Sequence, residues 1–547
     1  MLWQTLNQSQ ITNHKSLITV LLKNRNLKTK KEIDDFLNPK DPRDIKIQEL
    51  GIKNKDLKIV INRLNRAKKR KERIVIFGDY DADGVCATAI LWETMYKMGY
   101  DVMPYIPDRF EEGYGIKYTS FENENFKKLN PSLVITVDNG IVAYDAVKKS
   151  KNLGIDVIVV DHHAKGNKKL NTKYIIHNTN VCGSALSWFL SEALVKVGPS
   201  KQIIKRSDLN ISLDLAIIGT IADQMPLLGI NRSIVKFGLD ELNNTKKIGL
   251  KELFKQAGIT NIGVYEIGFI IAPRINAMGR LSKAIDSLRL LCTRNKEKAV
   301  ELAETLNQTN LERQKIVEDV LKRTLTEVDE KQKIIVIHGE YHEGVIGLAS
   351  GRVTERLYKP SIIISKGEKI SKASARSIAG FNIMEAIKET GLILEGGGHP
   401  MAAGFSIETT KIDLFIQKIN ALSDKLLTEE LLQRNLKIDV NLDFEIIDSE
   451  LINLIKKFEP FGNGNYAPVF ETKSVKIAEI KKVGSDGKHL KLKLEKDKKT
   501  IDAIAFGMAQ KELVKGSVID IAYSVEENVW NNKTSIQLKV KDISILP

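Results

Sequence analysis

The sequence predicts an α/β protein in which a doubly wound domain is joined by one long helix to a smaller α/β domain and then to a β-barrel. Three observations support this prediction. From Glu72 to about Cys292, apolar strand-like runs alternate with helical runs, as in a doubly wound sheet. Residues 296–328 lack Pro and Gly and are rich in Glu, Lys, Leu and Ala, which indicates one helix. From about Asn435, short strand-like runs are separated by Gly, Asn and Asp, which is typical of a small barrel.

The same patterns divide the 547 residues into five segments. We expect a basic, mostly helical segment at 1–70, the doubly wound domain at 71–292, the connecting helix at 293–330, the smaller α/β domain at 331–430 and the barrel at 431–547. Barrel strands are expected at 469–470, 474–480, 490–494, 501–506, 518–524 and 535–540. Short antiparallel strands with scattered lysines favour an OB-like barrel that binds single strands, although a barrel used only for packing is the alternative.

Composition and charge favour a polyanionic partner. The chain carries a formal charge of +15 and has a pI of about 9.3, and basic proteins gain affinity for nucleic acid by releasing counterions. Nucleotide bias in a genome is the alternative source of the lysines. No apolar run is long enough to span a membrane, and no signal peptide is apparent at Met1. The three cysteines are widely spaced, so we expect a cytoplasmic protein without a cysteine zinc site.

An acidic motif follows the first apolar run of the doubly wound domain. The run IVIF at 74–77 leads into GDYDADG at 78–84, which places Asp79, Asp81 and Asp83 where a buried strand ends. Carboxylates this close repel one another and lose hydration near a core. A divalent cation would supply the opposite charge, whereas a solvated turn is the alternative.

Three further apolar segments also end in Asp or His. The segments 133–137, 157–160 and 215–222 run into Asp138, into Asp161, His162 and His163, and into Asp223. The carboxyl ends of parallel strands line one crevice, so we expect a shared site there rather than independent caps and turns. Carboxylates with imidazole and no thiolate suit Mn²⁺ or Mg²⁺, and two such ions promote phosphodiester hydrolysis.

These residues carry a family resemblance. The motifs DYDADG, DNG at 138–140, DHH at 161–163 and Asp223 together resemble the DHH phosphoesterase superfamily. The run GGGHPMAAG at 396–404 is similar to the glycine-rich motif of the associated DHHA1 domain. PRINAMGR at 273–280 and FEPFG at 458–462 resemble segments of the bacterial RecJ family of single-strand-specific exonucleases. The resemblance covers nearly the whole chain in the expected order.

The resemblance implies a role for each residue of the acidic crevice. Asp138 would bridge two ions, with Asp81 serving one of them. The other ion would be held by Asp83, His162 and Asp223. His163 would lie beside the scissile phosphate, and Asp79 and Asp161 would ligate the ions or lie directly behind the ligands. Some superfamily members carry His four residues before the first metal Asp, where this chain has Phe77, so Asp161 or water would complete that ion's ligands.

The resemblance also implies two substrate-binding groups. A pocket for the terminal phosphate would be formed by Arg109, Ser374, Arg376, Gly397, Gly398 and His399. Gly lets the backbone approach a nucleotide closely, and the Arg fork engages phosphate bidentately. A gateway for the strand would be formed by Arg274, Arg280, Asn310, Arg313 and Gln314. Taken singly, each charged residue could also be a solvated surface charge.

The predicted function is a 5′→3′ exonuclease on single-stranded DNA that releases 5′-mononucleotides with two divalent cations, Mn²⁺ or Mg²⁺. An alternative is hydrolysis of short oligonucleotides or cyclic dinucleotides, as compact DHH proteins do. A non-enzymatic single-strand-binding scaffold is disfavoured because the metal carboxylates are present. The resemblance implies work in DNA repair and recombination, with a single-strand-binding protein and a helicase as partners, and we expect a monomer.

Overall fold

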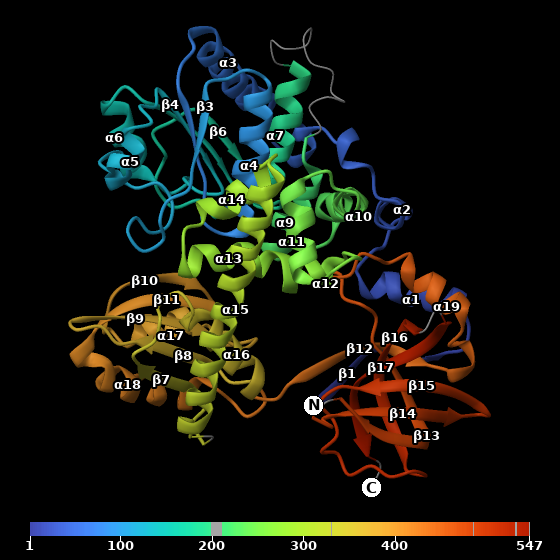
Figure 1. The fold of residues 1–547 in the computed structure, drawn as a ribbon. Helices are drawn as coiled ribbons and strands as arrows, with labels where there is room; N and C mark the ends of the chain where they lie inside the picture. Colours follow the sequence, from blue (N-terminus) through green and yellow to red (C-terminus); the bar gives the residue numbers. More distant parts are fainter. Residues whose placement is uncertain (198–210, 330, 485, 531–532, 546–547) are drawn as a thin grey trace. The chain divides into compact units, whose positions relative to one another are not determined.

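The computed structural model describes residues 1–197, 211–329, 331–484, 486–530 and 533–545. They form two compact units. The α/β unit comprises residues 46–223 and 238–434, and the barrel unit comprises residues 1–45, 224–237 and 435–547 (Figure 1). Each unit is described by itself below. Among the described residues, no helix has both the length and the apolar composition needed to cross a bilayer.

The first domain of the α/β unit contains an all-parallel sheet in the order β3-β2-β4-β5-β6. Every residue of β2 and β4 is buried, which is expected when helices cover both faces. One face packs on α5, α6 and the 3₁₀ turn 118–121 through Phe126, Val147 and Phe121. The doubly wound fold is therefore confirmed. The elements are β2 (Ile74–Phe77), β3 (Val102–Tyr105), β4 (Leu133–Val137), β5 (Asp156–Asp161), β6 (Ile175–His177), α3 (Asn54–Arg70), α4 (Ala82–Lys97), α5 (Glu124–Lys127), α6 (Tyr144–Asn152) and α7 (Gly183–Val197).

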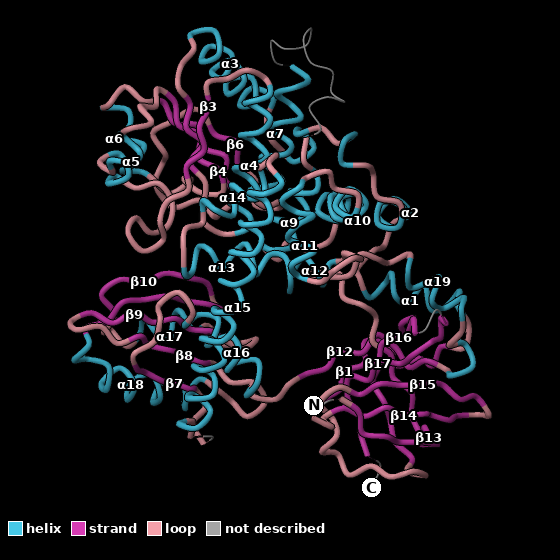
Figure 2. Tube along the Cα trace, in the orientation of Figure 1, coloured by secondary structure: helices cyan, strands magenta, loops and turns pink. Residues whose placement is uncertain are grey.

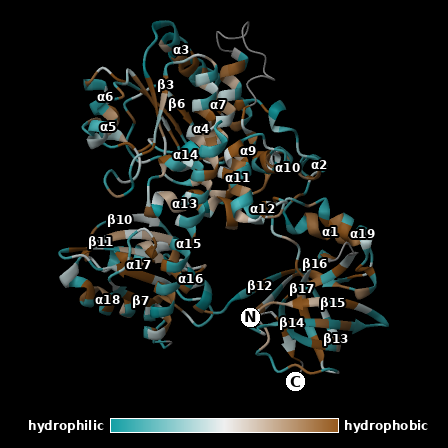
Figure 3. Cartoon of the chain, viewed as in Figure 1, coloured by the Kyte–Doolittle hydropathy of each residue, from teal (hydrophilic) through white to brown (hydrophobic). Residues whose placement is uncertain are grey.

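A layer of helices follows this sheet. The apolar run before Asp223, predicted as a strand, is helix α9, which corrects that prediction. All but the last residue of α9 are buried, and an apolar run without polar alternation does not distinguish a buried helix from a strand. Figure 3 shows the hydrophobic character of α9. The elements are α9 (Leu213–Ala222), α10 (Gly229–Asn243), α11 (Ile248–Ala257), α12 (Val264–Glu266), a π-helix (Ile267–Ile271), α13 (Ala272–Leu281) and α14 (Ile285–Cys292).

The predicted connecting helix is present as α15 (Lys296–Glu327). It leads into a five-stranded sheet in the order β10-β11-β9-β8-β7, in which only β7 and β8 pair in parallel. The glycine run of 396–398 lies in β10, at the edge of this sheet, and not in a simple turn. The elements are β7 (Ile335–Gly339), α16 (Ile346–Leu357), β8 (Ser361–Ser365), β9 (Ile370–Arg376), α17 (Ile383–Glu389), β10 (Ile393–His399), β11 (Ala402–Glu408) and α18 (Ile412–Leu426).

The barrel unit contains seven strands in the order β1-β12-β13-β14-β15-β17-β16, and pairing of β13 with β16 closes the last five into a barrel (Figures 1 and 2). The predicted strands 469–470 and 474–480 are merged into β13. The elements are β1 (Leu2–Ile11), α1 (His14–Asn24), α2 (Lys30–Leu37), β12 (Asn435–Leu442), α19 (Ser449–Lys456), β13 (Phe470–Val483), β14 (His489–Lys496), β15 (Lys499–Ala505), β16 (Val518–Trp530) and β17 (Lys533–Ile545).

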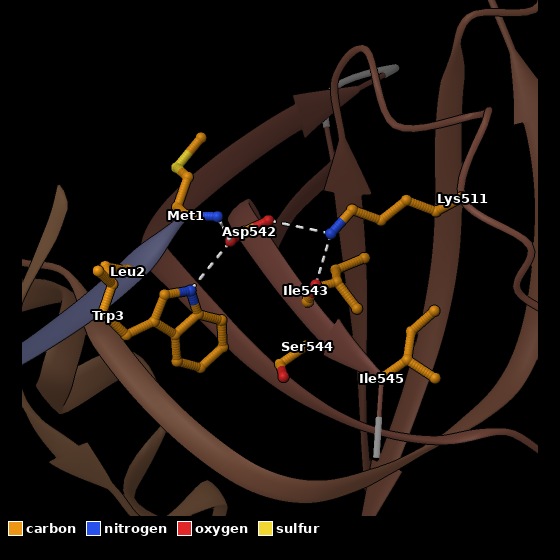
Figure 4. A pocket seen from close by; sticks show the side chains of 8 residues that line it. All are labelled: Met1, Leu2, Trp3, Lys511, Asp542, Ile543, Ser544 and Ile545. Carbon is orange, nitrogen blue, oxygen red and sulfur yellow. Dashed lines mark hydrogen bonds and ion pairs between the residues drawn. The ribbon is translucent and has the colours of Figure 1, made fainter. Parts of the chain in front are cut away.

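The N-terminal segment is mostly helical, as predicted, but it begins with a strand that the sequence did not indicate. Strand β1 pairs in parallel with β12, more than 400 residues later. Such pairing depends on a distant partner, which local propensity does not reveal. Asp542 helps to hold β1: its carboxylate accepts a hydrogen bond of 3.0 Å from Trp3 Nε1 and lies 3.0 Å from Lys511 Nζ, beside a cavity of about 630 Å³ (Figure 4).

A buried guanidinium fastens the helical part of the barrel unit. Arg232 on α10 is fully buried, and its guanidinium lies 4.0 Å from the centre of the Phe36 ring. It donates hydrogen bonds to the carbonyl oxygens of Phe36 (2.7 Å), Phe458 (2.9 Å) and Glu459 (2.7 Å). The FEPFG motif is thus tied through its backbone to the last turn of α2.

Candidate metal centre and phosphate cavity

The acidic residues meet at the carboxyl edge of the parallel sheet. Strands β2, β4 and β5 are consecutive neighbours, and they end at the motifs that contain Asp79, Asp138 and Asp161. Helix α9 ends at Asp223, which is the residue that caps its C-terminus. The fold therefore brings four motifs that are separate in the sequence into one cluster.

The cluster contains three overlapping groups whose ligand atoms lie within 4.8 Å of one another. These groups are Asp79, Asp81 and Asp138; Asp83, His162 and Asp223; and Asp138, His162 and His163. Asp138 belongs to two of the groups, and His162 Nε2 lies 3.1 Å from its Oδ1 atom. This arrangement suits two cations that share Asp138.

Helix termini and glycines hold the carboxylates in place. Asp81 caps α4 by accepting a hydrogen bond from Gly84 N at 2.9 Å. Asp83 accepts hydrogen bonds from Gly183 N (2.7 Å) and Ser184 N (2.9 Å) at the N-terminus of α7, where the helix dipole favours negative charge. A Cβ atom on Gly219 would lie 2.2 Å from Asp83 Oδ1, so the close approach of α9 requires glycine.

Without a cation the cluster is electrostatically strained. Burial, reinforced by neighbouring carboxylates, raises the pKa values of Asp79, Asp81 and Asp138. Burial and the charges of Asp83 and Asp81 raise the pKa of Asp223 to about 8. In the described part of the chain, buried Asp138 Oδ1 accepts no hydrogen bond of good geometry.

The residues present fit divalent cations. Five carboxylates and one imidazole form an oxygen-rich donor set suited to Mn²⁺ or Mg²⁺, and two such ions would offset four of the five negative charges. Phe77 is fully buried, with its ring 5.3 Å from Tyr105 and 5.9 Å from Phe126, and therefore offers no ligand. Asp79, and not Asp161, joins Asp81 and Asp138 in the group at this position.

His163 is oriented by two neighbours. Its Nδ1 atom lies 2.8 Å from Asp161 Oδ1, and Tyr114 Oη lies 3.2 Å from its Nε2 atom. Burial opposes protonation of His163, but the Asp161 carboxylate outweighs burial and raises the pKa of His163. Burial also opposes ionisation of Asp161, yet hydrogen bonds from His163 and from Ile141 N lower its pKa. These contacts occupy the Asp161 oxygens and favour an orienting role.

A cavity of about 900 Å³ in the α/β unit carries the basic residues. It is lined from the first domain by Tyr80, Arg109, Tyr114 and Arg280, and from the second domain by Gly347, Lys372, Ser374 and Arg376. Arg280 donates a hydrogen bond of 3.0 Å to Gly344 O. Burial and the nearby guanidinium groups of Arg109, Arg313 and Arg376 lower the pKa of Arg280 to about 10. Such a concentration of positive charge favours binding of phosphate.

The start of α16 forms a cradle within this cavity. A Cβ atom on Gly347, in the first turn of the helix, would lie 2.9 Å from Ser374 Oγ and 3.3 Å from Arg376 Nη2. The two side chains thus face the N-terminal turn of a 12-residue helix across a space that only glycine leaves open. A helix N-terminus with a hydroxyl and a guanidinium is a suitable site for a phosphate group.

The glycine-rich strand lies beside this cradle. His399 pairs with Ala402, which pairs in turn with Arg376, so His399 and Arg376 occupy the same row two strands apart. Strands are spaced about 4.8 Å apart, which places the two backbones roughly 10 Å from each other. Gly397 is opposite Gly404 in the row of Ser374. Gly397, Gly398 and His399 do not line the cavity, although neighbouring Gly396 does.

The predicted gateway residues are only partly together. Arg274 donates to Asn307 Oδ1 at 3.0 Å, and Arg313 donates to Asn310 Oδ1 at 2.9 Å. Asn310 is buried, and its Nδ2 atom and Arg313 Nε have no hydrogen-bond partner within the described ranges. Gln314 is exposed on the same helix.

Some residues of the site were not predicted. Tyr80 lies inside the DYDADG motif, and the Arg109 guanidinium lies 5.1 Å from the centre of its ring. Tyr114 is flanked by glycines at 113 and 115, which is the only local signal for a functional loop. Gly347 has no signal in the sequence; its role follows from the fold, which places β9 beside the start of α16.

Comparison with known proteins supports this description. Three family models match the chain in order: the DHH family N-terminal domain at 73–220, the DHHA1 domain at 330–424 and the RecJ OB domain at 438–542. The chain is 34% identical to the single-stranded-DNA-specific exonuclease RecJ of Bacillus subtilis, over 97% of this chain and 68% of that protein. It is 31% identical to the Haemophilus influenzae protein of the same name, over 97% and 96% of the two chains.

Solved structures agree with these sequence matches. The crystal structure of RecJ from Thermus thermophilus in complex with Mn²⁺ is similar over all of this chain and 80% of that one, with 27% identity and a TM-score of 0.82. The Mg²⁺ complex from the same organism gives a TM-score of 0.77 at 26% identity, over all of this chain and 79% of that one.

Proposed function

The chain belongs to the RecJ family of single-stranded-DNA-specific exonucleases, and from this premise we propose that it hydrolyses single-stranded DNA from the 5′ end and releases 5′-mononucleotides. The carrying observation is the juxtaposition, within one unit, of the carboxylate–histidine cluster and the arginine-lined cavity. Mn²⁺ or Mg²⁺ is the proposed cofactor, with Asp81 and Asp79 at one ion, Asp83, His162 and Asp223 at the other, and Asp138 between them.

The chemistry follows from these positions. Cations held by the carboxylates and His162 would supply positive charge to the attacking water and to the leaving oxygen of the phosphodiester. Asp161 and Tyr114 hold the His163 ring in place, and the Asp161 carboxylate favours its protonated form. A protonated imidazole at this point donates a hydrogen bond to the scissile phosphate and stabilises charge that develops on its oxygens.

Direction is set by the cradle at α16. The terminal phosphate would be held by the helix N-terminus, Ser374, Arg376 and Arg109, at a fixed distance from the metal cluster. A strand bound there would place its first phosphodiester bond at the carboxylate–histidine cluster, and each cleavage would release one nucleotide. Gly397, Gly398 and His399 would contact the strand from the neighbouring edge strand. Arg274, Arg280, Asn310, Arg313 and Gln314 would guide the rest of the strand.

The barrel and the cellular setting are further parts of the proposal. We assign single-strand binding to the OB-like barrel, whose match to the RecJ OB domain supports this role. A single-strand-binding protein and a helicase as partners, a role in DNA repair and recombination, a cytoplasmic location and a monomeric state stay predictions.

An end-labelled degradation assay tests the proposal. With Mn²⁺ or Mg²⁺, we expect single-stranded DNA to lose a 5′ label at once as mononucleotide, whereas duplex DNA of the same sequence is spared. Cleavage restricted to very short oligonucleotides or cyclic dinucleotides would indicate the alternative activity. Strand binding without cleavage under either metal would indicate a scaffold.

Asp138→Ala separates catalysis from binding. Loss of the shared ligand should lower cleavage by more than about a hundredfold, with strand binding retained. Because burial raises the pKa of Asp138, its ionised carboxylate opposes folding at neutral pH, so the metal-free variant should melt at a higher temperature than the wild type. Asp145→Ala, at an exposed position on α6, is the matched control and should change neither property. Activity of Asp138→Ala near the wild-type level would show that the metal site is assigned wrongly.

A further inference from the structure

Two large aromatic rings lie exposed on the α/β unit, outside the cavity. Tyr265 and Phe269 have exposed fractions of 63% and 68%, and their rings stack with centroids 4.9 Å apart and planes inclined by 25°. Single exposed aromatic residues are common in proteins. A stacked pair in which both rings face solvent presents a flat apolar surface whose area is suited to another planar group.

The backbone beneath the rings is firmly held. The π-helix of 267–271 buries Ile267 and Ile271 completely, and the position of Gly268 faces Ile221 of α9 at 3.6 Å. Ile221 precedes the metal-cluster residue Asp223 by two positions. The aromatic pair is therefore displayed from an element that packs on the helix leading into the metal cluster. π-Helical turns occur frequently at functional sites.

The Arg274 side chain is hydrogen-bonded to the backbone next to the aromatic pair. The Arg274 guanidinium donates to Ile270 O at 2.8 Å, next to Phe269 in the chain, and reaches Asn307 on α15. Arg313 donates to Asn310 Oδ1 at 2.9 Å, and the buried Asn310 Nδ2 and Arg313 Nε atoms have no hydrogen-bond partner in the described part of the chain. The nearby Glu266 carboxylate is occupied by Gly263 N at 2.9 Å.

We propose that Tyr265 and Phe269 form a stacking platform for the bases of single-stranded DNA on its way to the cavity. The phosphates of the same stretch of strand would be bound by Arg274, Asn310 and Arg313. This inference rests on the proposed exonuclease function and adds a binding surface to it. Exposed aromatic rings together with arginine side chains are the combination with which proteins hold single strands, because the rings stack on bases and the guanidinium groups contact phosphates.

The test compares binding of intact and abasic strands. The full chain is titrated in metal-free buffer with a DNA strand of about 20 nucleotides and with a strand of equal length in which the internal bases are abasic. The double variant Tyr265→Ala/Phe269→Ala should bind the intact strand roughly 10- to 100-fold more weakly than the wild type. On the abasic strand the two proteins should bind equally, because the phosphates remain and there is no base to stack.

Two controls accompany the double variant. Tyr265→Phe keeps the ring and should bind like the wild type. Tyr96→Ala removes another exposed ring, 58% exposed on α4, and should also bind like the wild type. Because neither ring lines the cavity, cleavage of a dinucleotide bound there should be unchanged in the double variant.

Each remaining outcome overturns the platform. Equal binding of the intact strand by wild type and double variant excludes stacking at these residues. An equal loss on intact and abasic strands indicates a general effect on folding or charge. A change in oligomeric state of the double variant assigns the pair to an interface between copies of the chain. A wild type that neither binds nor cleaves single strands refutes the proposed function itself, and the platform with it.

Discussion

Gly347→Ala is the substitution that most directly tests the phosphate cradle. The added methyl group would lie 2.9 Å from Ser374 Oγ and 3.3 Å from Arg376 Nη2, in the space assigned to the terminal phosphate. Hydrogen bonds to charged groups contribute about 1.5–3 kcal/mol each. Loss of one such bond should therefore reduce kcat/KM for 5′-phosphorylated strands by roughly 10- to 150-fold. Strands that begin with a 5′-hydroxyl do not fill the cradle and should be cleaved at the wild-type rate.

The assay is the ratio of kcat/KM for 5′-phosphorylated and 5′-hydroxyl strands of the same sequence. Gly351→Ala is the matched control, since it lies one turn later on α16 and its added Cβ atom would be 3.9 Å from Arg376 Cγ, an ordinary contact. Replacing Gly by Ala within a helix raises stability by about 1 kcal/mol, so Gly351→Ala should not melt below the wild type. At Gly347 this gain is opposed by the 2.9 Å contact with Ser374 Oγ, so the melting temperature of both variants is measured with the activity. A stable Gly347→Ala protein with the wild-type ratio would refute the cradle, as would a wild type without preference for the phosphorylated end.

Two further predictions concern the stability of the barrel unit. Arg232→Met leaves the carbonyl oxygens of several residues around Phe458 without their buried donor, so it should lower the free energy of unfolding by about 3–5 kcal/mol. Lys236→Met, one turn along α10, removes the single hydrogen bond from Lys236 to Leu37 O and should lower the free energy of unfolding far less. Equal melting temperatures of Arg232→Met and Lys236→Met would contradict the role of Arg232. Asp542→Asn should lower the melting temperature at pH 7. Burial opposes ionisation of Asp542, but hydrogen bonds from Trp3 and Lys511 lower its pKa. The stability contributed by the Asp542 carboxylate is therefore present above about pH 4 and disappears as the pH falls through the lowered pKa. A difference in melting temperature between wild type and Asp542→Asn that persists at about pH 2 would count against this linkage.

The metal centre could be predicted because its signal is local. Asp79, Asp138 and His162 each follow a short buried run, and parallel strands have their carboxyl ends at one edge. Asp223 lies beside Asp83 and His162, although the apolar run before it is a helix and not the predicted strand. A helix that ends at the sheet edge delivers a carboxylate there as effectively as a strand does.

The substrate side was less accessible to sequence reasoning. Arg109 and Arg376 were named from resemblance, but nothing local placed them in one cavity or placed Gly347 opposite Ser374. His399 was grouped with Arg376, and the strand register separates their backbones by two strands. No motif indicates that Tyr265 and Phe269 are exposed, and apolar residues on a helix usually lie on the face that packs on the core.

The fold class, the long connecting helix and the chemistry of the metal centre could be predicted from the sequence. Each of these depends on short-range patterns: periodicity, helix propensity, and carboxylates at the ends of buried runs. The tertiary structure alone decided the pairing of β1 with β12, the clamp of Arg232 on the FEPFG backbone, and the cradle between α16 and β9. Those features join residues far apart in the chain, and their energies arise from packing and hydrogen bonds that exist only after folding.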